Sequence, residues 1–98
     1  MGMSVTRIGE FQAQDGKAER LRTLLSAALP AIRSSKGCRS CQLLQSQGDP
    51  ARILVIEVWD SVEAHQASVK SIPPESVEKT RSLLAAAPKA GYYTEQAT

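Results

Sequence analysis

A seven-residue stretch in the middle of the chain, ILVIEVW at residues 53–59, limits the possible folds most strongly. The side chains of a strand alternate between its two faces. One face carries Ile53, Val55, Glu57 and Trp59, and the other carries Leu54, Ile56 and Val58. Both faces are largely apolar, so both must be covered by other parts of the protein.

The residues before this strand predict a strand and a long helix. A strand is expected at 5–13, and the QDGK sequence at 14–17 has the composition of a turn. An amphipathic helix then begins near Lys17, because apolar residues recur at spacings of four, three and four. This apolar stripe consists of Leu21, Leu25, Ala28 and Ile32. Pro30 is expected to kink or restart the last turn, and Gly37 to end it.

The remaining segments predict two more strands and a pair of helices. Strands are expected at 38–45 and 90–94. Asp60 is expected to cap a helix directly after the central strand, with Glu63 reaching back as in a capping box. Another helix is expected at 75–87, after paired prolines that suit a new first turn.

This order of elements predicts one α+β domain over residues 1–98: a ferredoxin-like fold with a four-stranded antiparallel sheet and helices on one face. The other face of the sheet would expose more apolar surface than a soluble monomer usually tolerates. A second copy packing sheet to sheet would cover that face. We therefore expect a homodimer, a dimeric α+β barrel, with burial against a different protein as the alternative.

Composition argues against two classes of partner. The 12 basic and 10 acidic residues are scattered, without a run that would follow a phosphate backbone, so no nucleic acid is expected. No apolar segment approaches the length of about 20 residues needed to span a bilayer, and the first residues do not resemble a signal peptide. We expect a cytoplasmic protein without a membrane partner.

The CRSC sequence at residues 38–41 matches the spacing of a redox pair or of half a zinc site. Along a regular strand, however, residues three apart point to opposite faces and cannot share a disulfide or a metal ion. The chain also has too few further ligands. We therefore interpret both cysteines as structural thiols and expect no metal site.

The single histidine, His65, is the main candidate for catalysis. It lies on a predicted apolar stripe of the second helix, made of Val62, His65, Val69 and Ile72, and so should face the sheet. It is either a core histidine bonded to a carbonyl or a general base in a pocket between helix and sheet. A partly desolvated imidazole can titrate near neutral pH.

Two residues of the central strand are candidates for a binding role. Trp59 is either core filler or the flat wall of a pocket for a planar ligand. Glu57 shares its face and, if buried, must be paired. We favour an ion pair with Arg7 or Arg39 over a second acid–base group with a raised pKa.

Tyr92 and Tyr93 are adjacent on the last strand and therefore face opposite sides of the sheet. Either phenol is an ordinary packed residue or a hydrogen-bond donor to a ligand oxygen. The chain contains none of the common nucleotide-binding, metalloprotease or nucleophile-elbow motifs, so no cofactor is expected.

Three motifs in order resemble the antibiotic biosynthesis monooxygenase family, small dimeric α+β barrels. They are the first strand running into DGK, the KGCRSCQLLQ entry to the second strand, and above all ILVIEVWDSVEAH, which is similar to the family's Glu-x-Trp strand end and its helix start. The resemblance covers Val5 to Tyr93. It is moderately specific for the fold and weakly specific for chemistry.

The resemblance implies a ligand pocket between sheet and helices and, in the oxygenases, oxidation of a phenol, quinol or anthrone without a cofactor. Deprotonation makes such a substrate electron-rich enough to reduce dioxygen itself. Trp59 falls on the family's strand-end tryptophan, and His65 on a site where an oxygenase uses a tyrosine. Ser68 stands where many members have a histidine, and the haem degraders' ligating histidine has no counterpart near Glu78 or Lys79.

We therefore hypothesise a cofactor-independent monooxygenase acting on a small aromatic metabolite. His65 would be the base, and Trp59, Tyr92, Tyr93, Glu57 and Ser68 would contact the substrate. The alternative is a non-catalytic dimeric ligand-binding or stress-response protein of the same fold.

Overall fold

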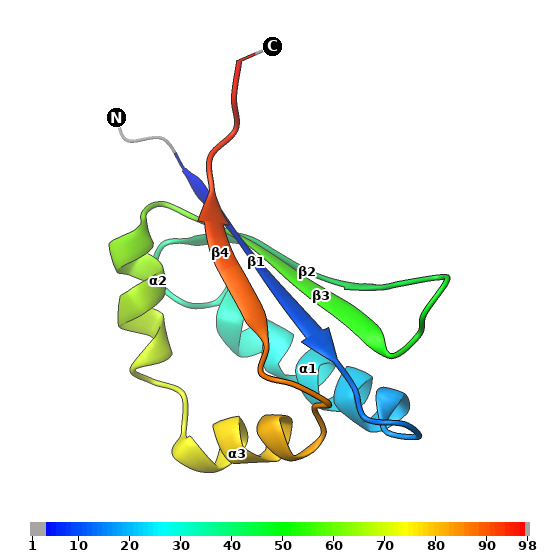
Figure 1. Cartoon of the computed structure of the whole chain (residues 1–98). Coiled ribbons are helices and arrows are strands. Elements are labelled where there is room, and N and C mark those ends of the chain that lie inside the picture. Colours follow the sequence, from blue (N-terminus) through cyan, green and yellow to red (C-terminus); the bar gives the residue numbers. More distant parts are fainter. Residues whose placement is uncertain (1–3, 98) are drawn as a thin grey trace.

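The computed structural model describes residues 4–97 and contains one antiparallel sheet with three helices. The strands are β1 (Val5–Gln12), β2 (Cys38–Gln45), β3 (Arg52–Trp59) and β4 (Lys89–Tyr93), in the spatial order β2-β3-β1-β4. The helices are α1 (Ala18–Arg33), α2 (Val62–Val69) and α3 (Pro74–Ser82). Figure 1 shows α1 behind the sheet, α2 beside the end of β3, and α3 near the start of β4. The predicted ferredoxin-like α+β fold is confirmed.

Helix α1 covers β2 and β3. Its buried residues are Leu21 and Leu29, whereas Ala28 of the predicted stripe is exposed. The helix continues through Pro30, and the backbone N–H of Ser34 donates to the Pro30 carbonyl at 3.1 Å, so the last turn is not restarted. The predicted stripe included the small Ala28, whereas the residue that is buried is the larger Leu29 at the next position.

The central strand β3 alternates as expected between two faces. Ile53, Val55, Glu57 and Trp59 are buried against the helices. Their counterparts on the opposite face are Leu54, Ile56 and Val58, which stay half-buried. Ile53 packs with Leu21 in a core where both are fully inaccessible to solvent. No helix of the described residues is long and apolar enough to cross a membrane.

The two cysteines share one face of β2, which corrects the argument from strand geometry. A bulge between Cys38 and Ser40 places Cys38 opposite Trp59 and Cys41 opposite Glu57, and both of these β3 residues face the helices. The extra residue of the bulge cancels the alternation that a regular strand would impose. Both cysteines are free thiols.

Helix α2 begins one residue later than predicted. Its cap is Ser61, whose side chain accepts a hydrogen bond from the Ala64 backbone N–H at 3.1 Å. Asp60 instead accepts from Arg39 Nε at 2.7 Å. Asp60 is thus held in a salt bridge with Arg39, and Ser61 caps the helix in its place.

The second half of the predicted apolar stripe on α2 does not face the sheet. His65 is buried, but Val69 and Ile72 are exposed, because the helix ends at Val69 and the chain turns away towards α3. Helix α3 is also shorter than predicted and buries none of its residues. Leu84, which follows it, is buried through a bridge to Ala13.

Candidate active site

Three strands place polar side chains in one row on the helix-facing side of the sheet. Arg7 of β1 lies opposite Glu57 of β3 on one side and opposite Tyr92 of β4 on the other. Directly opposed residues in antiparallel strands point to the same face. Helix α2 adds His65 above this row, so residues 8 to 85 positions apart in sequence meet at one point.

His65 joins the row at two of its members. Its Nδ1 lies 2.6 Å from the Tyr92 hydroxyl oxygen, and its Nε2 lies 4.0 Å from Glu57 Oε1. The nearby carboxylate favours the tautomer with the proton on Nε2. Nδ1 then accepts a hydrogen bond from the Tyr92 hydroxyl, which is the arrangement that a base needs.

Glu57 is buried and fully paired, as expected. Its Oε1 accepts from the Trp59 indole N–H at 2.8 Å, and its Oε2 lies 3.5 Å from an Arg7 guanidinium nitrogen. Of the two predicted partners, Arg7 is the correct one, since Arg39 pairs with Asp60. Held in this way, the carboxylate lies 4.0 Å from His65 Nε2.

Trp59 is 1% exposed and packs against His65 edge-on, with ring centroids 5.4 Å apart. The indole therefore fills the core and contacts both the imidazole and the carboxylate. A ligand cannot stack on its face unless the surrounding side chains move.

The surroundings of the imidazole lower the pKa of His65 below its ordinary value. Burial is the main cause, because it disfavours the charged ring, and the positive charge of Arg7 adds to it. The Glu57 carboxylate opposes both. His65 is therefore neutral at physiological pH and able to accept a proton.

Tyr92 connects this buried cluster to solvent. It is 39% exposed although it lies on the helix-facing side of the sheet, and its neighbour on that face, Ala90, is exposed as well. Tyr93 points to the opposite face and is 56% exposed. The two tyrosines thus face opposite sides, as expected, and only Tyr92 reaches His65.

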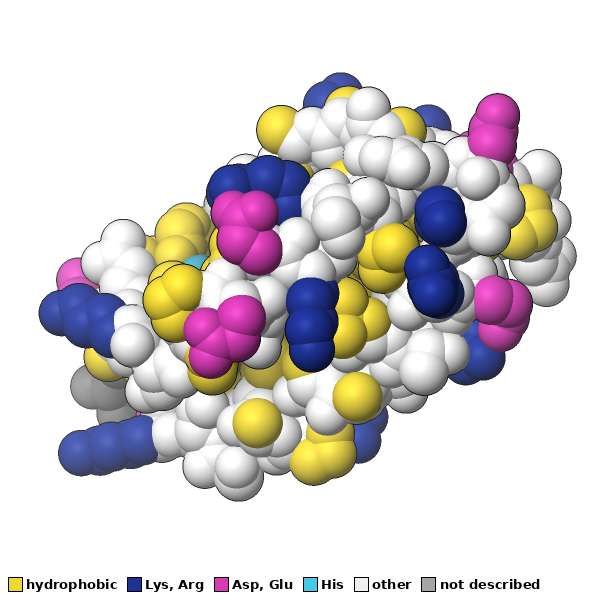
Figure 2. Space-filling model, turned by 90° about the horizontal axis from the view of Figure 1, so that it is seen from below, with side chains coloured by type: hydrophobic (Ala, Val, Ile, Leu, Met, Phe, Trp, Pro, Cys, Tyr) yellow, Lys and Arg dark blue, Asp and Glu magenta, His cyan; other side chains and the backbone are white. Residues whose placement is uncertain are grey.

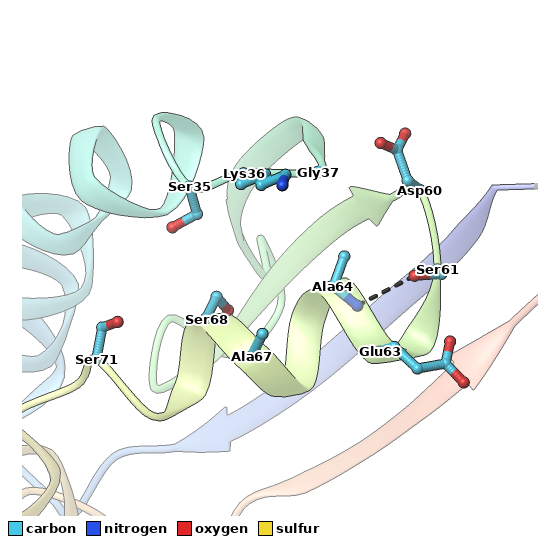
Figure 3. Close-up of a pocket in the computed structure, with 10 residues that line it drawn as sticks. All are labelled: Ser35, Lys36, Gly37, Asp60, Ser61, Glu63, Ala64, Ala67, Ser68 and Ser71. Atoms are coloured by element: carbon cyan, nitrogen blue, oxygen red, sulfur yellow. Dashed lines mark hydrogen bonds between the residues drawn. The ribbon is translucent and has the colours of Figure 1, made fainter.

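Ser68 lies apart from the cluster. Its hydroxyl donates to the His65 carbonyl at 2.7 Å, and it lines a groove of about 520 Å³ between α2 and the loop after α1. Figure 3 shows Ser68 on the side of α2 that faces Ser35 and Lys36. The lining residues include neither Trp59 nor Tyr92, so this groove is separate from the row of polar residues.

Two further observations describe the polar side chains of residues 4–97. No group of three or more His, Cys, Asp or Glu side chains is arranged to hold a metal ion there. Acidic and basic side chains are interspersed on the face seen in Figure 2, without a continuous field of one sign.

Arg7 is the member of the site that the sequence pointed to least directly. It was expected only as one of two partners for Glu57. Its position could have been found from register, since an arginine on the helix-facing side of a central strand must lie near a carboxylate or water.

The model of one protein family, described as antibiotic biosynthesis monooxygenase, matches residues 4–87. The chain belongs to this family. A comparison of the sequence with curated proteins gives no match. Among solved structures it resembles a putative antibiotic biosynthesis monooxygenase from Chloroflexus aurantiacus, with 30% identity, 97% and 95% of the two chains covered and a TM-score of 0.78.

Two further structures are similar to this monooxygenase-family chain. A protein from Pseudomonas aeruginosa shares 25% identity over 99% and 98% of the two chains, with a TM-score of 0.85. SnoaB from Streptomyces nogalater, a cofactor-independent oxygenase, shares 17% identity over 97% and 95%, with a TM-score of 0.81. At this identity the likeness to SnoaB concerns the fold.

Proposed function

We propose that the chain is a cofactor-independent monooxygenase that acts on a small planar aromatic compound such as a phenol, quinol or anthrone. The observation that supports this most is the short contact between buried, neutral His65 and the partly exposed Tyr92 hydroxyl. Family membership supports the same reaction class.

The proton moves through Tyr92. A substrate C–H or O–H gives its proton to the Tyr92 oxygen while Tyr92 passes its own to His65 Nδ1. The imidazolium formed has its Nε2–H directed towards the Glu57 carboxylate, which stabilises the new positive charge. The role proposed for His65 is thus that of a base that acts through Tyr92.

The substrate anion then supplies the electrons. For an anthrone, the CH₂ carbon transfers electrons to dioxygen, one oxygen atom becomes the carbonyl of the product, and the other leaves as water with the two hydrogens. The protein binds the substrate on the helix-facing side of β1 and β4, beside the partly exposed Tyr92, and holds the proton during this exchange. Trp59 supports the site from behind, by fixing Glu57 and His65.

Oxygen uptake with a panel of quinols and anthrones tests the proposal. We expect uptake above the rate in buffer for at least one compound, and a loss of about 100-fold in His65→Ala. Gln66→Ala is the control, because Gln66 is exposed on the same helix. A rate unchanged by His65→Ala would exclude the proposed base.

A second candidate is a non-catalytic ligand-binding protein. One observation favours it: among residues 4–97, no fully buried side-chain N or O atom lacks a hydrogen-bond partner, so the cluster is satisfied without substrate. Under this reading ligand binding occurs without oxygen uptake for every compound of the panel.

We further propose that two copies pack through their open sheet faces. That face carries half-buried or exposed apolar side chains on all four strands: Ile8, Leu44, Leu54, Ile56, Val58 and Tyr93. Sedimentation at micromolar concentration should give a particle of twice the 10.6 kDa chain mass. Ile56→Lys should yield monomers, whereas Ser26→Lys, on the exposed side of α1, should not. A monomeric wild type would contradict this packing.

A further inference from the structure

Arg7 has more hydrogen-bonding capacity than the cluster uses. A guanidinium carries five N–H donors and stays charged at any relevant pH. Among residues 4–97, the only partner of its side chain is Glu57, at 3.5 Å and through a single nitrogen. The other two nitrogens form no hydrogen bond to the described residues.

These unused donors reach water. The Arg7 side chain is 25% exposed, and no described side-chain nitrogen is both fully buried and unpaired. Water that solvates these donors can be replaced by a carboxylate, which makes stronger, charge-assisted hydrogen bonds to a guanidinium. The free donors of Arg7 beside Glu57 are therefore available to an anionic group of a ligand.

Gly9 lies between Arg7 and Phe11 on β1. A side chain at Gly9 would come within 3.4 Å of both the Arg7 guanidinium and the Phe11 ring. Arg7 lies along β1 next to Gly9, on the face it shares with Tyr92 of the neighbouring strand. The free donors, the Tyr92 hydroxyl and an aromatic ring thus lie on the same side of the sheet.

We infer that Arg7 binds a carboxylate of the ligand, so that the preferred ligand is an aromatic acid whose ring lies over β1 and β4. A carboxylate can accept two parallel hydrogen bonds from a guanidinium, which matches the number of free nitrogens. This inference rests on the proposed ligand site, and it adds the ligand's charge to it. It requires no turnover.

Two unreactive probes of the same shape test the inference: 2-naphthoate, which is anionic, and 2-naphthamide, which is neutral. Binding of each to the full-length protein is followed by NMR chemical shifts at constant pH and salt. We expect 2-naphthoate to bind at least about tenfold more tightly, with the largest shifts at the amides of Ala90–Tyr92.

Arg7→Gln should reduce this ratio to about one, by weakening the binding of 2-naphthoate. Glutamine keeps a donor for Glu57, so the fold should be retained, and thermal unfolding checks this. Arg39→Gln removes an exposed arginine that pairs with Asp60 and should leave the ratio as in the wild type.

Equal binding of the two probes, binding of neither, or a ratio that survives in Arg7→Gln would each overturn the inference. The proposed oxygenase activity fails separately, through the absence of oxygen uptake. If the protein discriminates between the probes but consumes no oxygen, the inferred carboxylate site stands and the proposed oxygenase reaction is contradicted.

Discussion

The Nδ1 atom of His65 and the hydroxyl oxygen of Tyr92 lie 2.6 Å apart, and this contact links a buried helix residue to a partly exposed residue of the last strand. It makes Tyr92 the outer member of the site and His65 the inner one. Substitutions at the two tyrosines should therefore have different effects.

Tyr92→Phe should lower oxygen uptake by about tenfold to 100-fold, because the proton can no longer pass to His65 through a hydroxyl. Tyr93→Phe should have little effect, since that hydroxyl lies on the opposite face of the sheet. Initial rates with the same substrate compare the two. Equal losses in both variants would contradict the relay.

The stability of the protein should fall as the pH drops below about 6.5. The unfolded chain has an ordinary histidine, whereas the folded state lowers the pKa of His65, so the unfolded state binds more protons between the two values. The stability difference is fully present above the unfolded pKa and is lost towards the folded one. Urea unfolding between pH 5 and 7.5 measures it, and His65→Gln should remove this contribution.

Arg7→Gln should raise the pKa of His65 towards its ordinary value, because the positive charge of Arg7 helps to lower it. The other groups facing the imidazole, Glu57 and Tyr92, stay in place. His65 is the only histidine, so the proton NMR signal of its ring reports the titration directly. An unchanged pKa would mean that burial alone sets it.

Gly37→Ala should destabilise the protein by about 1–3 kcal/mol. Gly37 has a φ of +87°, and an added Cβ would lie 2.7 Å from the Ala64 Cβ on α2. Gly48→Ala meets nothing within 4 Å and should stay within about 0.5 kcal/mol of the wild type. Chemical denaturation of both variants checks this close contact between the loop after α1 and α2.

Cys41 should resist alkylation in the folded protein at pH 8. Its thiol is 3% exposed, and burial together with the Glu57 charge raises its pKa to about 11. Iodoacetamide and mass spectrometry should find Cys41 unmodified unless denaturant is added. Rapid native labelling at Cys41 would show that β2 opens readily.

Much of the fold follows from local patterns. Turn residues and alternating side chains locate all four strands within two residues of their observed ends, because these signals depend only on neighbouring positions. The bulge at Cys38 was not predicted, because it is not a local feature of the sequence. It depends on pairing with β3, which local sequence does not encode.

The site was less predictable than the fold. The inward position of His65 follows from periodicity and is confirmed, whereas the burial of Glu57 was left open and is found only in the structure. The contact between His65 and Tyr92 depends on strand order, which brings β4 beside β1. Separating Ser68 from the cluster required the actual rotation of α2, since Ser68 and His65 lie three residues apart on one helix.

The edge-on packing of Trp59 against His65 also gives the protein an internal optical probe. The chain has one indole and one imidazole, and their rings are in contact. A charged imidazolium quenches the fluorescence of a neighbouring indole more strongly than a neutral imidazole does. The fluorescence of the unlabelled protein should therefore dim when the imidazole takes up a proton, so that proton transfer can be followed in real time.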